Sequence, residues 1–120
     1  MNINQAVENL QKNKVVESIM QFGSSLTKKY FRDVDLCIFT KKKIALKEKL
    51  RMIRGLPERF DVNFYDDLSL NLKHEVMSKG KVLYSRNYYK LLKEGQYVER
   101  EYPRFAVFLE DYHKKRMAEL

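Results

Sequence analysis

The chain has 120 residues, of which 44% are hydrophobic and 33% are charged, a balance typical of one folded domain and not of a disordered segment. No apolar run reaches the roughly 20 residues that a membrane-spanning helix needs, and the first residues lack a signal peptide's apolar stretch, so we expect a cytoplasmic protein without a membrane partner. The 24 Lys and Arg against 16 Asp and Glu give a net charge of +8, which favours a polyanionic ligand without identifying it.

The first two predicted elements are a helix and a strand. Apolar residues recur at helical spacing near the start of the chain, namely Ile3, Ala6, Val7 and Leu10. They predict a helix over residues 2–13 that covers one face of a sheet. Residues 15–22 are rich in β-branched side chains and predict the first strand. Gly23 then permits a sharp turn, and Ser24 or Ser25 can cap a short helix that ends near Lys29.

Two acids open the second predicted strand, which runs from Asp33 to Thr40. Side chains alternate between the faces of a strand, so Asp33 and Asp35 share one face while Val34, Leu36 and Ile38 point into a core. Repulsion between the two carboxylates is relieved most simply by a hard divalent cation, which would also bridge to a phosphate held at the turn before it.

The separate motifs in this stretch also have simpler interpretations. A Gly-Ser-Ser sequence alone is usually a turn, and an isolated Asp-x-Asp is usually a solvated strand end. Cys37, the only cysteine, shares the acids' face and could flank the site, but a small buried residue is the simpler role. One cysteine also excludes an internal disulfide and a cysteine-based zinc site. Only the conjunction of turn and acids favours a phosphate and metal site.

The middle of the chain predicts three further elements. A basic amphipathic helix is expected from about Lys42 to Arg54, where Gly55-Leu56-Pro57 ends it. A third strand is expected over Arg59–Tyr65, with Phe60 and Val62 facing the core and Asp61 on the other face. Asp66 and Asp67 suit the turn that follows this strand.

A further helix and strand are expected next, with the helix from Leu70 to near Gly80 and the strand over Lys81–Tyr84. His74 on that helix is expected at the surface, because no second His or Cys stands at metal-binding spacing.

The last segment, residues 87–118, predicts an aromatic helix. Four apolar residues recur in it at helical spacing: Phe105, Phe108, Leu109 and Tyr112. Pro103 is expected to break or kink this helix. So much aromatic surface either packs onto the protein's own sheet or contacts another chain, and both interpretations stay open. We expect Phe105, Phe108 and Tyr112 to contribute to a partner or self-association surface, so a hetero- or homo-oligomer is predicted.

The stretch of Gly23-Ser24 followed by Asp33-Val34-Asp35-Leu36 resembles the signature of the minimal nucleotidyltransferases in the DNA polymerase β superfamily. The resemblance covers residues 2–85 and is looser over residues 87–118. It implies an α+β fold, in which a small mixed sheet of three to four strands is flanked by helices and followed by a helical C-terminus. Residues 1–120 would form a single nucleotidyltransferase domain.

The resemblance also implies an activity. A nucleoside monophosphate, with AMP from ATP as the expected case, would be transferred to a hydroxyl of a protein acceptor. The nucleotide would be bound at Gly23, Ser24 and Ser25. Two Mg²⁺ ions would be held by three acids, Asp33, Asp35 and Asp61, of which Asp61 would position or deprotonate the attacking hydroxyl. Members of this family often accompany a helical HEPN-type toxin, and the chain would be the antitoxin that neutralises it.

The sequence departs from the family pattern in the loop before the second strand. Residues 25–32 form a shorter loop than the family's commonest one, and Lys28 or Lys29 stands near the place of a second glycine. An alternative is therefore a non-catalytic nucleotide-binding or scaffolding subunit of a two-component complex. A basic RNA-binding domain is a third hypothesis, supported only by the net charge.

Overall fold

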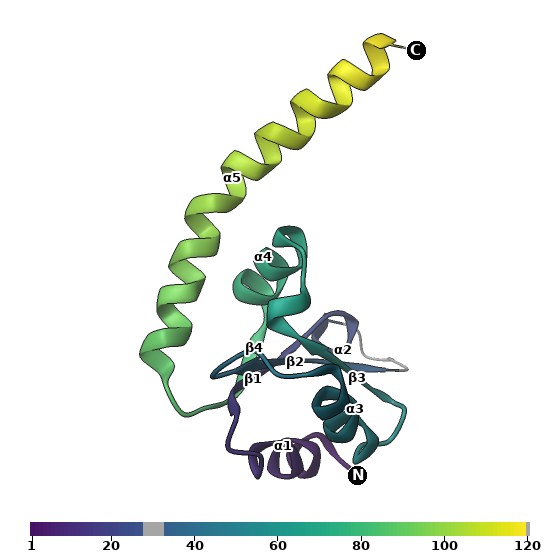
Figure 1. The fold of residues 1–120 in the computed structure, drawn as a ribbon, viewed down its shortest axis with the longest axis vertical. Helices are drawn as coiled ribbons and strands as arrows, with labels where there is room; N and C mark the ends of the chain where they lie inside the picture. Colours follow the sequence, from purple (N-terminus) through teal and green to yellow (C-terminus); the bar gives the residue numbers. More distant parts are fainter. Residues whose placement is uncertain (28–32, 120) are drawn as a thin grey trace.

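A four-stranded mixed sheet with the strand order β3-β2-β1-β4 forms the centre of the protein (Figure 1). The computed structural model describes residues 1–27 and 33–119. The central strand β1 (Val16–Phe22) is antiparallel to both β2 (Val34–Thr40) and β4 (Lys81–Ser85). β2 is parallel to the edge strand β3 (Phe60–Phe64). The α+β fold with a small mixed sheet is thus confirmed.

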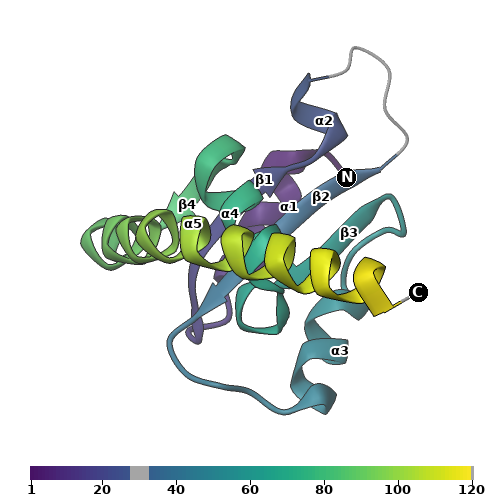
Figure 2. The ribbon, with the colours of Figure 1, turned by 90° about the horizontal axis from the view of Figure 1, so that it is seen from above.

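Helices cover both faces of this sheet. α1 (Ile3–Gln11) and α3 (Leu46–Arg54) pack on one face, and α4 (Leu70–Lys79) lies on the other (Figure 1). The long helix α5 (Tyr88–Glu119) packs against α4 and crosses that same second face (Figure 2). Two single turns complete the described chain, namely α2 (Ser24–Thr27) after β1 and the 3-10 helix η1 (Tyr65–Asp67) after β3.

The alternation predicted for the second strand is observed in β2. Val34, Leu36 and Ile38 are fully buried in the core beneath α1 and α3. Cys37 and Phe39 are buried in a second cluster, beneath α4 and α5. β2 is therefore apolar on both faces over most of its length, and only its first residues can carry polar chemistry. Cys37 has the buried role that the sequence favoured.

An irregularity in β1 adjusts which residues reach the core. The pairing of β1 with β2 shifts register between Val16 and Ser18, which places Glu17 in a bulge. As a result both Val16 and Ile19 are buried in the α1–α3 core, although a regular strand would put them on opposite faces.

The helix predicted from Lys42 begins at Leu46, so the prediction was wrong at its start. β2 and β3 are parallel, and the chain must therefore cross from the end of one strand back to the start of the other. Residues 41–45 form the first part of this crossover, where the Thr40 hydroxyl donates a hydrogen bond to the Lys42 carbonyl (2.8 Å). A helix that started at Lys42 would leave no chain for that turn.

α5 continues through Pro103 without a break, and Figure 1 shows its axis bending partway along. A proline ring removes one backbone hydrogen bond and crowds the carbonyl four residues earlier, which bends a helix without ending it when both flanks favour helix. The side chains of Phe105, Phe108 and Tyr112 lie outside the described part of the structure. Within that part no helix, α5 included, is both long and apolar enough to cross a membrane.

The buried face of β2 predicts a clear difference between two leucines. Leu36→Ala removes a side chain with no exposed surface and should lower the free energy of unfolding by about 2–5 kcal/mol. Leu46→Ala makes the same chemical change at a residue that is 70% exposed and should change the free energy of unfolding by less than about 0.5 kcal/mol. Urea denaturation followed by circular dichroism measures both, and similar values for the two variants would contradict the observed burial.

Candidate active site

The turn after β1 brings the backbone of Gly23 against the carboxylate of Asp35. Gly23 has a φ of +79°, in the left-handed region that other residues rarely adopt. A Cβ atom at this position would overlap Oδ2 of Asp35, because Asp35 pairs with Phe22, the residue directly before the glycine. Conformation and close approach therefore both require glycine here, and they place the predicted phosphate turn beside one predicted metal ligand.

A second carboxylate reaches this point from the neighbouring strand. In the parallel register of β2 and β3, Asp35 is aligned with Asp61. Neighbouring strands lie about 4.8 Å apart, and aligned residues point to the same face, so the two carboxylates stand side by side. Asp33 precedes β2 and is exposed, as is Asp61, whereas Asp35 is half-buried. Like charges are thus gathered where the strands begin.

The surroundings raise the pKa of Asp35 from 3.8 to about 6. Burial of the carboxyl is the largest cause, followed by a hydrogen bond to the Asp61 carboxyl and by the negative charges of Asp61, Asp33 and Glu75. The site therefore favours a proton or a cation on Asp35. Such an arrangement also suits a hard divalent ion with oxygen ligands.

Glu75 of α4 is a fourth acid that the sequence reasoning missed. It is half-buried, and its negative charge contributes to the raised pKa of Asp35. A single glutamate on an amphipathic helix gives no signal in the sequence. Only the packing of α4 on the second face of the sheet brings it toward the acids.

The two serines of the predicted nucleotide site differ in their contacts. Ser24 is exposed. The Oγ atom of Ser25 accepts a hydrogen bond from Nε2 of the buried Gln21 (2.9 Å), which fastens α2 to the end of β1. The turn is closed by the Leu26 N–H, which donates to the Gly23 carbonyl (3.2 Å). Ser25 thus has a structural contact in which its hydroxyl oxygen is the acceptor.

The other predicted residues are distributed as follows. Asp66 and Asp67 lie in η1 beyond the end of β3, and Asp67 pairs with Lys49 (2.7 Å). They are therefore at the opposite end of β3 from Asp61, as the sequence indicated. His74 stacks on Tyr102, with ring centroids 3.7 Å apart. Lys28, Lys29 and Arg32, which belong to the shortened loop, lie outside the described residues.

The donor set fits magnesium by its chemistry. Carboxylate oxygens are the ligands that this ion prefers, and it usually keeps several waters as well. Over residues 1–27 and 33–119, no three His, Cys, Asp or Glu side chains already converge into a closed metal cluster. Any ion at this site would therefore complete its coordination with water or with phosphate oxygens of a bound nucleotide.

The sequence model of the family described as "Polymerase beta, Nucleotidyltransferase" matches residues 4–89. That is more than half of the chain, and it includes the Gly23 turn and all three predicted acids. The chain belongs to the polymerase β nucleotidyltransferase family. A comparison with curated protein sequences found no match.

Solved structures of MNT antitoxins in toxin–antitoxin complexes share this fold. A complex with AMP-PNP aligns at a TM-score of 0.79 and 17% identity, covering 98% of this chain and 99% of that one. An MntA-HpeT variant in which two aspartates two positions apart are replaced by glutamate aligns at 0.80 and 15%, with the same coverage. A tri-AMPylated Shewanella oneidensis HEPN toxin in complex with its MNT antitoxin aligns at 0.74 and 17%, covering 95% and 94%. At these identities the likeness shows the fold.

The contact between Gly23 and Asp35 predicts a cost for any side chain in the turn. Gly23→Ala should lower the free energy of unfolding by about 1–3 kcal/mol, because alanine must adopt a positive φ and displace the Asp35 carboxylate. Gly55→Ala is the matched control, since Gly55 has a negative φ and its added methyl would meet the end of the Asn9 side chain and, at ordinary contact distance, the Met52 carbonyl. Adding Asp35→Ala to Gly23→Ala should recover part of the loss. Equal losses in both glycine variants would contradict this.

The raised pKa of Asp35 predicts a pH dependence with a definite sign in the metal-free protein. The folded protein holds the Asp35 proton up to about pH 6, whereas the unfolded chain releases it near pH 3.8. The contribution of this proton to stability is therefore complete below pH 3.8 and is lost as the pH rises through 6. Wild type should lose stability relative to Asp35→Asn between about pH 4 and pH 7. Chemical denaturation across that range measures the difference, and a difference that does not change with pH would refute the shift.

Proposed function

We propose that this chain transfers AMP from ATP to a hydroxyl of a protein acceptor, using Mg²⁺, and acts as the antitoxin of a HEPN-type toxin. The observation that supports the proposal most directly is the alignment of Asp35 with Asp61 beside the turn at Gly23. A family of nucleotidyltransferases supplies the reaction type, and the geometry supplies residues for it.

In the proposed reaction the turn at Gly23 and Ser24 binds the triphosphate through backbone N–H groups and a hydroxyl. Asp33, Asp35 and Asp61 would hold Mg²⁺, which would neutralise the developing charge on the phosphates and on the leaving group. Asp61, which is more exposed than Asp35, orients the acceptor hydroxyl and accepts its proton. The hydroxyl oxygen bonds to the α-phosphorus, the bond from that phosphorus to the bridging oxygen breaks, and pyrophosphate leaves.

The fold relatives support the choice of acceptor and nucleotide. One was crystallised with AMP-PNP, and another is the partner of a HEPN toxin that carries AMP. The described surface adds a second argument, because α5 carries exposed apolar side chains that a protein partner could cover: Tyr88, Tyr89, Leu92, Tyr97 and Val107. The stripe of Phe105, Phe108 and Tyr112 extends the same helix and stays a prediction.

A second candidate function is nucleotide binding without turnover, in which the chain inhibits its partner by binding to it and transfers no group. The feature that favours it is the loop of residues 25–32, which is shorter than the family's commonest loop and carries Lys28 or Lys29 near the place of a second glycine. Under this alternative Mg²⁺ and ATP would still bind and stabilise the fold by about 2.7 kcal/mol at 100 times the dissociation constant, but no AMP would be transferred.

Labelled ATP, Mg²⁺ and a purified HEPN-type partner provide the test. Wild type should label the partner, and Asp61→Asn should reduce the rate at least about 100-fold, because it removes both a metal ligand and a proton acceptor. Asp66→Asn makes the same change five positions along the chain, in η1, and should leave the rate near that of wild type.

Three results would separate the candidates. Thermal stabilisation by Mg²⁺ and ATP that Asp33→Asn/Asp35→Asn abolishes, without any labelling of the partner, would support binding without turnover. Equal labelling by wild type and Asp61→Asn, with a collapse in Asp66→Asn, would overturn the assigned acid. Absence of both labelling and stabilisation would reject the site altogether.

A further inference from the structure

The far end of the sheet holds a cavity of about 590 Å³ that the proposed reaction does not use. It lies between the start of β1, the end of β2, η1, α4 and α5. Its size is within the range of small-molecule sites. Thr40 of its lining and Asp35 of the acid site stand five residues apart on one strand, so about 17 Å separates them. The cavity and the acid site therefore lie at opposite ends of β2.

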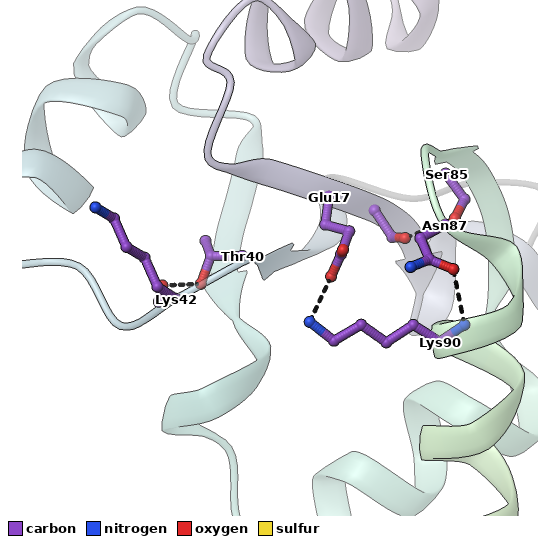
Figure 3. A network of polar contacts seen from close by, with 7 residues as sticks. Glu17, Thr40, Lys42, Ser85, Asn87 and Lys90 are labelled. Atoms are coloured by element: carbon purple, nitrogen blue, oxygen red, sulfur yellow. Dashed lines mark hydrogen bonds and ion pairs between the residues drawn. The ribbon is translucent and has the colours of Figure 1, made fainter.

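Positive charge exceeds negative charge around this cavity. Five lysines line it, namely Lys41, Lys42, Lys73, Lys90 and Lys93, against the three acids Glu17, Asp66 and Glu94. Two of the acids already have partners. Glu17 pairs with Lys90 (3.0 Å), as Figure 3 shows, and Glu94 accepts a hydrogen bond from the Tyr65 hydroxyl (2.7 Å). Apart from Lys90, none of these lysines forms an ion pair within the described residues.

The walls of the cavity are held by fixed polar contacts. The Ser18 and Ser85 hydroxyls are hydrogen-bonded at 2.8 Å, and the backbone N–H of Lys90 donates to Oδ1 of Asn87 (3.1 Å) at the start of α5 (Figure 3). The side chain of Lys42 points away from the Glu17–Lys90 pair in Figure 3, so Lys42 adds positive charge at the edge of the cavity without joining that pair.

Aromatic rings supply the remaining recognition surface. Phe39 and Tyr65 stack with centroids 4.3 Å apart at the base of the cavity, where both are buried. The ammonium of Lys73 lies 5.0 Å from the centre of the Tyr65 ring, which keeps this charge next to the base of the cavity. At the rim, Tyr97 of α5 is 49% exposed and offers a ring face on which a flat base can stack.

From this geometry we propose that the cavity binds a nucleoside phosphate, either as a free nucleotide or as the phosphorylated end of a single-stranded RNA. The phosphate lies near Lys41 and Lys73, and the base stacks on Tyr97. Lysine binds phosphate as a point charge. The exposed aromatic ring of Tyr97 favours a nucleoside, which can stack on it, over an acidic peptide as the molecule that carries the negative charge. The inference does not rest on transfer activity, because it concerns the other end of the sheet.

Amide chemical shifts test the proposal on the full chain in EDTA, where Mg²⁺-dependent binding at the acids is removed. Titration with AMP, and separately with a 5′-phosphorylated RNA oligonucleotide, should shift residues around Thr40, Asp66 and Glu94 in a saturable way. The same oligonucleotide without its phosphate should bind at least tenfold more weakly. Saturation by AMP identifies a free nucleotide as sufficient, and saturation by the phosphorylated RNA alone identifies an RNA end.

Two pairs of lysine variants distinguish a specific binding site from nonspecific attraction between a positively charged protein and an anion. Lys41→Gln/Lys73→Gln should weaken binding at least tenfold. Lys12→Gln/Lys47→Gln removes the same charge from two exposed lysines outside the cavity and should change it by less than twofold. Tyr97→Ala, at an exposed side chain, should weaken AMP more than inorganic phosphate. Equal weakening in both lysine pairs, shifts confined to residues near Gly23 and Asp61, or tighter binding of a polyglutamate peptide than of AMP would overturn the proposal.

Discussion

The parallel pairing of β2 with β3 is the constraint on which the candidate active site depends. It aligns Asp35 with Asp61, and it exists only because residues 41–59 carry the chain back across the sheet, with α3 in between. In an antiparallel pair the start of one strand would face the end of the other. Asp61 would then lie near Thr40, far from Asp35. The topology, more than any single contact, therefore gathers the acids.

Gathering like charges is unfavourable, and the opposite face of the same strand holds them in place. Val34, Leu36 and Ile38 have no exposed surface, and a slip of one residue would move all three to the opposite face and turn Asp35 toward the core beneath α1 and α3. Each buried aliphatic side chain contributes about 1.5–3 kcal/mol, so the register withstands the repulsion behind the raised pKa of Asp35. The clustered carboxylates oppose folding, and the apolar core on the other face of β2 favours folding. Such a locally unfavourable arrangement, stabilised by the rest of the fold, is typical of a functional site.

The sequence predicted those features that depend on the spacing of apolar and polar side chains. The faces of β2 and β3 followed from alternation, and α1 followed from the helical spacing of its apolar residues. Features that depend on long-range packing were not predicted: the bulge at Glu17, the late start of α3 at Leu46 and the approach of Glu75 to Asp35. α5 passes through Pro103 because helix-forming flanks on both sides outweigh one lost hydrogen bond.

The chain has a net charge of +8, but the two ends of β2 carry charges of opposite sign. Acids gather at Asp33 and Asp35, where the strand begins, and lysines follow directly after Thr40, where it ends. A phosphate-bearing molecule would be attracted to the lysine end directly, but to the acid end only when a cation stands between carboxylates and phosphate. Removal of divalent ions should therefore affect one end and spare the other. The two ends of β2 thus attract anions in different ways, directly at the lysines and through a cation at the acids. The net charge of +8 does not reveal this difference.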